Sequence, residues 1–255
     1  PFFYDITLRD GNQSLKKPWS LPEKEVVFKR LLDLNVQAVE VGFPNSSEMD
    51  FEACKYLASI APKKLVISAL ARCTEKDVTS AVQAISHASI PRIHTFLTLS
   101  PFHMKYVLNK DPMEVKKTAI EAVKFAYEQV KKANKNGEVQ FSVEHFGDCS
   151  ENLDFVIGTL QEIVKAGATT INLPNTVERK RPRVFLDMIE RVYDALPKDV
   201  VISLHNHNDL GMATATTVEG YFSGAVQLEC ALNGLGERAG NTNFYEVAVA
   251  LHNSG

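Results

Sequence analysis

Short apolar runs and amphipathic segments alternate along the whole chain. The apolar runs are rich in β-branched and aromatic residues, which is typical of buried strands. The segments between them repeat apolar residues every three or four positions, which predicts helices that bury one face. We expect strands at residues 2–8, 38–42, 64–70, 92–97, 139–144, 169–173, 200–205 and 227–232. We expect helices at residues 22–34, 48–60, 75–86, 112–133, 152–165, 182–195, 212–223 and 243–253.

This order makes eight strand–helix pairs. Apolar strands that alternate with helices are typical of a parallel sheet whose outer face the helices cover. Eight such units in 255 residues predict an α/β protein, a closed (β/α)8 TIM barrel that forms one domain over residues 1–255. An open, doubly wound sheet is the alternative, but no glycine-rich phosphate loop opens the first predicted helix. The pattern therefore favours the barrel.

Polar groups gather where the predicted strands end. In such a barrel, the carboxyl ends of the strands and the loops that follow them form the active site. The most informative stretch is LHNHND, residues 204–209, at the end of the seventh predicted strand. His205 and His207 are two positions apart, so their side chains point to the same side of the strand. Two imidazoles placed in this way can bind one metal ion.

Residues from other strand ends could complete such a site. Asp10, His205 and His207, with an amide oxygen from Asn241, make a set of oxygen and nitrogen donors. No thiolate belongs to this set, which argues against a closed structural zinc site. A divalent Mg²⁺ or Mn²⁺ fits it best, and a catalytic Zn²⁺ would also fit. A 2-oxoacid could then chelate the open positions through its carboxylate and ketone oxygens.

Two further residues suit chemistry on a polarised ketone. Arg9 could stabilise the alkoxide that forms when the ketone is attacked. Glu144 could transfer a proton or orient a water molecule. The alternative for Glu144 is a structural ion pair with Arg9 or Arg72.

Composition narrows the choice of partners and of cellular location. The net charge of −3 gives no reason to expect nucleic acid or an anionic membrane as a partner. No apolar run approaches the roughly 20 residues of a membrane span. The four cysteines are far apart and form no CxxC pair, which predicts reduced thiols in a cytoplasmic protein. We therefore expect small-molecule substrates.

Several motifs, taken together, resemble a known family. They are LRDGNQS (8–14), RIHTFLTLSPFHMKY (92–106), LPNTVE (173–178), LHNHNDLGMATATT (204–217) and NGLGERAGNTN (233–243). They resemble the metal-dependent TIM-barrel acyltransferases and lyases, which include 2-isopropylmalate, homocitrate and citramalate synthases, HMG-CoA lyase and biotin-dependent carboxyltransferases. The resemblance covers essentially the whole chain and is greatest to the 2-isopropylmalate synthases.

The resemblance implies a reaction, in which the enolate of acetyl-CoA attacks the ketone of 3-methyl-2-oxobutanoate. Hydrolysis of the thioester then releases 2-isopropylmalate and CoA, the first committed step of leucine synthesis. It also implies roles for residues. The implied metal ligands are Asp10, His205, His207 and Asn241. The implied substrate contacts are Arg9 at the ketone oxygen, Ser142 and Glu144 as an SxE pair, His94, Thr176 at the carboxylate, and Leu70 and Asn172 at the side chain.

The chain departs from the family pattern at two motifs. NTVE (175–178) stands where many bacterial members have DTVG, and DGNQ (10–13) replaces the commoner DGEQ. These departures leave the 2-oxoacid open, so a homocitrate or citramalate synthase is an alternative. An HMG-CoA-type lyase would usually carry a reactive cysteine after the eighth strand, and residues 233–241 contain none.

Family synthases continue past the barrel into a linker subdomain and a leucine-sensing domain. The linker lends a histidine and a tyrosine to acetyl-CoA, and the last residue of this sequence is Gly255. A truncated, non-catalytic paralogue that binds a 2-oxoacid is therefore another alternative. The resemblance also implies a homodimer whose subunits share C-terminal segments.

Overall fold

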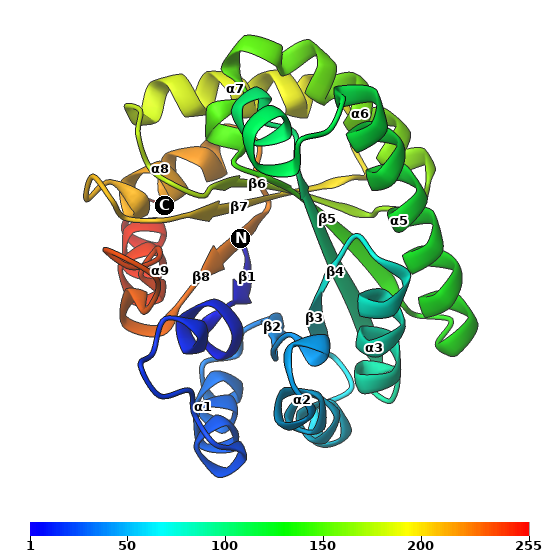
Figure 1. Ribbon diagram of the computed structural model, residues 1–255. Helices are drawn as coiled ribbons and strands as arrows, with labels where there is room; N and C mark the ends of the chain where they lie inside the picture. Colours follow the sequence, from blue (N-terminus) through cyan, green and yellow to red (C-terminus); the bar gives the residue numbers. More distant parts are fainter. Residues whose placement is uncertain (255) are drawn as a thin grey trace.

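Eight parallel strands close into a barrel in the order of the chain (Figure 1). The computed structural model describes residues 1–254. Strand β1 pairs with β2 on one side and with β8 on the other, which closes the sheet. The strands are β1 (Phe2–Asp5), β2 (Ala38–Glu40), β3 (Val66–Arg72), β4 (Ile90–Thr98), β5 (Glu138–Glu144), β6 (Thr170–Asn175), β7 (Val201–Asn206) and β8 (Gln227–Cys230).

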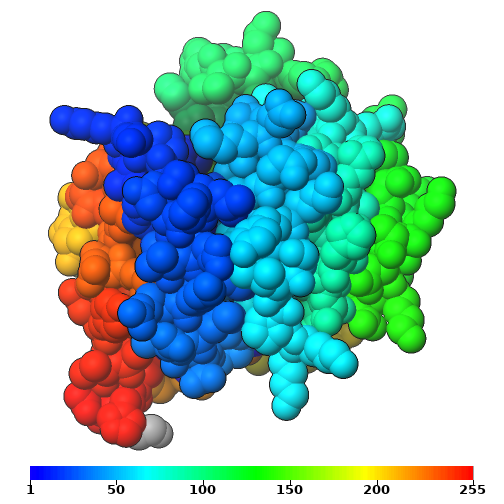
Figure 2. Space-filling model, turned by 90° about the horizontal axis from the view of Figure 1, so that it is seen from below, coloured from blue at the N-terminus to red at the C-terminus, as the bar shows by residue number. Residues whose placement is uncertain are grey.

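A ring of helices surrounds the barrel (Figure 1). The long helices are α1 (Leu21–Asp33), α2 (Glu48–Ile60), α3 (Glu75–Ile85), α5 (Pro112–Ala133), α6 (Leu153–Lys165), α7 (Pro182–Ala195), α8 (Ala213–Phe222) and α9 (Phe244–Asn253). A short helix, α4 (Pro101–His103), follows β4. In Figure 2 the blue N-terminal part of the chain lies against its red and orange C-terminal part. Among residues 1–254, no helix has both the length and the apolar character needed to cross a bilayer.

The predicted TIM barrel is confirmed, and the structure differs from the prediction mainly at the first strand. Strand β1 ends at Asp5 because the Asp5 carboxylate accepts hydrogen bonds from the backbone N–H and the hydroxyl of Thr7, at 2.8 and 2.9 Å. Residues Thr7–Gly11 then form one π-helical turn. Turns of this kind are frequent at functional sites. This turn carries Arg9 and Asp10 to the carboxyl end of the barrel.

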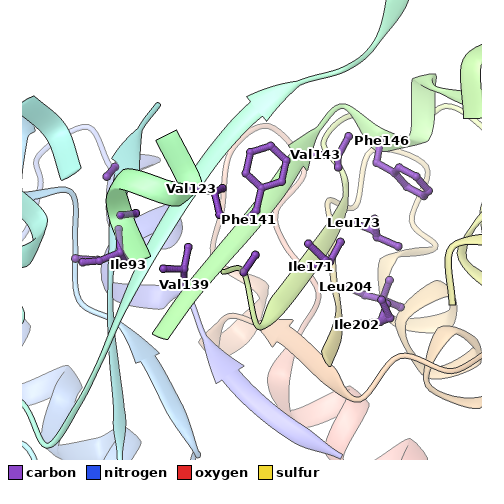
Figure 3. Packing of buried hydrophobic residues seen from close by; sticks show 14 of the residues in the cluster. Ile93, Val123, Val139, Phe141, Val143, Phe146, Ile171, Leu173, Ile202 and Leu204 are labelled. Carbon is purple, nitrogen blue, oxygen red and sulfur yellow. The ribbon is translucent and has the colours of Figure 1, made fainter. Parts of the chain in front are cut away.

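The hydrophobic core lies between the barrel and its helices. Alternate residues of each strand face outward, and the large side chains of β5 meet those of α5 (Figure 3). Phe141 and Val143 are fully buried there, as is Val123 of α5. The burial of apolar area at about 25 cal/mol per Å² is the main force that holds helices to the sheet.

The inside of the barrel holds a buried polar network, unlike the packed apolar interior typical of this fold. Arg92, Gln140, Gln227 and Glu229 are all buried, and they join one another by hydrogen bonds. The inward positions therefore carry a polar network beside a small apolar cluster that includes Tyr4, Ala38 and Val66, and the outward positions carry most of the apolar core.

Helix α3 begins at a side-chain cap, which yields a prediction about stability. The Thr74 hydroxyl accepts a hydrogen bond from the Asp77 backbone N–H at 3.2 Å. We expect Thr74→Ala to lower the free energy of unfolding by about 1 kcal/mol, because this N–H then loses its partner. Urea denaturation would measure the loss, with the exposed mid-helix variant Thr79→Ala as the control. Equal stability of the two variants would contradict the cap.

Candidate active site

Three side chains of metal-ligand type meet at the carboxyl end of the barrel. They are Asp10, from the turn after β1, and His205 and His207, from the end of β7. Each offers one ligand atom within 4.8 Å of the others. All three residues are buried. The rings of His205 and His207 are stacked with their centroids 4.9 Å apart. The two histidines therefore share one side, as their spacing predicted.

Asn241 lies between Asp10 and His205. Its amide nitrogen donates to Oδ1 of Asp10 at 2.7 Å and to the carbonyl of Leu235 at 3.0 Å. These two acceptors fix the orientation of the amide, so its oxygen faces Nε2 of His205 at 2.9 Å. The four predicted metal ligands are thus brought together.

The donor atoms of this group fit a divalent cation. His205 has its Nδ1 facing the carboxylate of Glu229 at 3.1 Å. With the proton on Nδ1, the lone pair of Nε2 points at the amide oxygen of Asn241, which is also an acceptor. Nδ1 of His207 is buried and has no hydrogen-bond partner among residues 1–254. Two acceptors that face each other beside the Asp10 carboxylate are what a bound cation would satisfy.

Burial and neighbouring charges shift the pKa values of the three residues. The pKa values of Asp10 and His207 are lowered, and that of His205 is raised. Burial acts to raise the pKa of Asp10, but Arg9, His205 and His207 together hold it well below its usual range. Burial and the neighbouring His205 lower the pKa of His207 to about 3. Burial also acts to lower the pKa of His205, but the Glu229 and Asp10 carboxylates raise it overall. Asp10 is therefore ionised and His207 neutral near pH 7, the forms in which they ligate metals.

Arg9 is held rigidly beside this group. Its Nη1 donates to Oδ2 of Asp10 at 2.6 Å, and its Nε pairs with the fully buried Glu40 of β2 at 2.5 Å. Burial acts to raise the pKa of Glu40, but the charges of Arg9 and His94 bring it down to about 2. The guanidinium is thus fixed by two ionised carboxylates and lines the pocket.

The predicted substrate residues His94, Ser142 and Asn172 form one hydrogen-bonded chain with Glu40. Nδ1 of His94 meets Oε1 of Glu40, and its Nε2 lies 2.6 Å from the hydroxyl of Ser142. The same hydroxyl accepts a hydrogen bond from the amide of Asn172 at 2.8 Å. This chain runs across the pocket floor from β2 to β6.

Glu144, at the end of β5, is placed differently from these residues. Its side chain makes no hydrogen bond or ion pair within residues 1–254, and burial raises its pKa. Arg9 pairs with Glu40, and Arg72 pairs with Asp77 at 2.7 Å. The structural ion pair considered for Glu144 is therefore absent from the described residues.

The remaining predicted residues also line the pocket, whose volume is about 530 Å³. Leu70 is buried in its wall, one strand away from His94. The Thr176 hydroxyl accepts a hydrogen bond from the backbone N–H of His145 at 2.9 Å. The Thr176 carbonyl accepts a hydrogen bond from Arg238 at 2.7 Å. The structure thus brings together the predicted metal and substrate residues, and their roles stay predictions.

Sequence reasoning missed two buried carboxylates of this site. Glu40 fixes Arg9 and His94, and Glu229 faces His205. Both interrupt apolar strand runs, AVE at 38–40 and QLEC at 227–230. A charged residue in a strand that is otherwise buried was the available signal, because buried charges are rare unless they are paired.

The sequence of the whole described barrel matches one family model, that of the HMGL-like family, over residues 1–255. The chain belongs to the HMGL-like family. This HMGL-like chain is 56% identical to 2-isopropylmalate synthase 2 of Leptospira interrogans, over 100% of this chain and 59% of the relative. It is 40% identical to the 2-isopropylmalate synthase of Pyrococcus abyssi, over 98% of this chain and 50% of the relative. The chain therefore spans between half and three-fifths of the length of these curated relatives.

Solved structures of similar fold include two HMG-CoA lyases. The enzyme from Brucella melitensis has a TM-score of 0.80 at 19% identity, over 99% of the HMGL-like chain and 90% of that structure. The enzyme from Pseudomonas aeruginosa has a TM-score of 0.80 at 16% identity, over 99% and 85% of the two chains. At these identities the likeness shows the barrel fold.

Proposed function

We propose that residues 1–255 form the catalytic domain of a 2-isopropylmalate synthase. The proposed reaction joins the methyl carbon of acetyl-CoA to the ketone carbon of 3-methyl-2-oxobutanoate, and water then cleaves the thioester to release CoA. The observation that carries the proposal is the convergence of Asp10, His205 and His207 on one point beside Arg9. The identity of 56% to a named 2-isopropylmalate synthase supports this choice of reaction.

The proposed cofactor is a divalent cation, Mg²⁺ or Mn²⁺, with Zn²⁺ as a further candidate. Asp10, His205, His207 and Asn241 would hold it, and their oxygen and nitrogen donors suit these ions. When bound, such a cation polarises the ketone of a 2-oxoacid and orients it.

Arg9 is proposed to stabilise the negative charge that develops on the ketone oxygen. Its two carboxylate partners hold the guanidinium in place before the substrate arrives. Donors fixed in advance cost little reorganisation when the charge appears, which makes this kind of stabilisation effective. Glu40, which orients Arg9, also holds His94 and, through it, the Ser142 hydroxyl.

Glu144 is proposed as the proton-transfer group. It lines the pocket without a partner of its own among the described residues, so it is free to contact a substrate or a water molecule. Burial raises its pKa, which brings the carboxyl closer to the range in which it can exchange a proton at neutral pH.

The charges in the pocket favour a 2-oxoacid with an apolar side chain. Every lysine and arginine of the pocket lining already has a carboxylate partner: Arg9 has Glu40 and Asp10, Lys24 has Asp50, and Arg238 has Asp209. The second carboxylate of 2-oxoglutarate would therefore meet no free cation there. Leu70 and Phe96 offer apolar surface instead.

A panel of 2-oxoacids tests this choice. With acetyl-CoA and a reagent that detects the thiol of free CoA, we expect turnover of 3-methyl-2-oxobutanoate to exceed that of pyruvate and 2-oxoglutarate. The physical reason is that the pocket offers apolar contact and no unpaired cation. Faster turnover of 2-oxoglutarate would indicate a homocitrate synthase, and faster turnover of pyruvate would indicate a citramalate synthase.

Binding without turnover would identify the non-catalytic alternative. Calorimetry could detect binding of a 2-oxoacid to the full-length protein in the presence of Mg²⁺. If the same protein released no CoA in the activity assay, the proposed synthase function would be overturned. A homodimer and a cytoplasmic location are further parts of the proposal, and they rest on the resemblance and on the cysteine pattern alone.

A further inference from the structure

We propose that Glu229 is a positioning residue that fixes His205 as a metal ligand through Nε2. The proposal rests on the metal site of the proposed function. Glu229 lies on β8 and is completely buried inside the barrel. Its Oε2 is 3.1 Å from Nδ1 of His205 on the neighbouring strand β7. This buried oxygen has no other hydrogen-bond partner to satisfy it within residues 1–254, and Nδ1 of His205 is the ring nitrogen that faces it.

Hydrogen bonds fix the other carboxylate oxygen of Glu229, Oε1. Oε1 of Glu229 accepts hydrogen bonds from the Gln140 amide at 2.7 Å and the Ser203 hydroxyl at 3.0 Å. Gln227 donates to Gln140 and to Ser203, and Arg92 donates to Gln227 at 2.6 Å. The polar network of the barrel interior therefore sets the direction in which Oε2 points.

A carboxylate in this place selects one tautomer of His205. Glu229 can only accept, so the imidazole proton belongs on Nδ1, and the lone pair is left on Nε2. Nε2 is also the nitrogen that faces Asn241 and Asp10, at 2.9 and 4.0 Å from their oxygens. A histidine that ligates metal commonly donates its second N–H to a carboxylate, which fixes the ring and strengthens the ligand.

The neighbouring histidine has no equivalent support. Nδ1 of His207 is buried without a partner within the described residues. Glu229 therefore acts on one of the two histidines, and its loss should change the metal site without removing a ligand.

Glu229→Gln is the sharpest test, because the amide has nearly the same shape as the carboxylate but brings two donors. If its nitrogen faces His205, two donors meet and the ring must change tautomer. If it faces the other way, it opposes the donors of Gln140 and Ser203. We expect Mn²⁺ affinity, measured by calorimetry on the full chain, to fall about 10–100-fold, as for other carboxylate partners of metal-bound histidines.

Two comparisons separate a positioning role from a structural one. Glu219→Gln makes the same change at an exposed position of α8, outside the polar network of the barrel interior, and it should leave Mn²⁺ affinity unchanged. The visible spectrum of bound Co²⁺ should change in Glu229→Gln and not in Glu219→Gln. Unchanged Mn²⁺ affinity and Co²⁺ spectrum in Glu229→Gln would overturn the proposal for Glu229 and leave the metal site standing.

A measurement on the unmodified protein keeps the proposal testable if Glu229→Gln does not fold. In the ¹⁵N spectrum of histidine-labelled protein with Zn²⁺, the His205 ring should carry its proton on Nδ1 and the metal on Nε2. The opposite assignment would overturn the proposal. Absence of any metal binding by the unmodified protein would overturn both this proposal and the metal site itself.

Discussion

Asp10→Ala is expected to weaken Mn²⁺ binding by more than about 100-fold and to abolish metal-dependent binding of the 2-oxoacid. Changing only a partner of a metal ligand typically costs about 10–100-fold, and this variant removes a ligand outright. Asp10 also supplies the negative charge that faces His205 and His207. His207→Ala should have the same effect, because it removes a neutral imidazole that no other side chain of the group replaces. Calorimetric titration with Mn²⁺ would measure both variants.

The matched control for these variants is His87→Ala. His87 is exposed in the turn after α3, and its removal should leave metal affinity unchanged. Circular dichroism should show that the barrel stays folded in all three proteins. Unchanged Mn²⁺ affinity in Asp10→Ala or in His207→Ala would refute the ligand assignment.

Glu144→Gln is expected to lower kcat about 10²–10⁴-fold, the usual contribution of a positioned acid or base. The amide keeps the size of the side chain but cannot take up or release a proton at neutral pH. The KM for the 2-oxoacid should change little, because Glu144 belongs neither to the proposed ligands nor to the chain from Glu40 to Asn172. Release of CoA, followed with a thiol reagent, would measure both constants.

The control for Glu144→Gln is Glu151→Gln, the same change at an exposed position shortly after β5. It should leave kcat unaltered. A rise in KM for the 2-oxoacid in Glu144→Gln, with kcat preserved, would contradict a role in proton transfer and would indicate a binding role instead.

The order of elements could be predicted from the sequence because each strand presents apolar residues outward to the helices. The outward residues of β5, such as Phe141 and Val143, made the strand recognisable as a buried one. The end of β1 could not be predicted in the same way. The apolar character continues through Ile6 and Leu8, but Asp5 bonds to Thr7 and turns the backbone there.

The proposed ligands could be predicted because they lie at the carboxyl ends of strands or in the loops that follow them. Their supporting carboxylates could not. Glu40 and Glu229 lie inside short strands, and the partners that make their burial tolerable come from other elements, Arg9 from the turn after β1 and His205 from β7. His94 contacts Glu40 across 54 positions of the chain, and only the closed barrel brings such pairs together.

Closure of the barrel has a thermodynamic consequence. Asn241 and Asp10 are 231 positions apart, yet they are hydrogen-bonded, because β8 lies beside β1. A metal ion bound by both residues would link the segment after β1 to the segment after β8. It would therefore bind only chains in which β1 and β8 are paired. The melting temperature should therefore rise with metal concentration, since a ligand at about 100 times its Kd adds about 2.7 kcal/mol to the stability of the folded form.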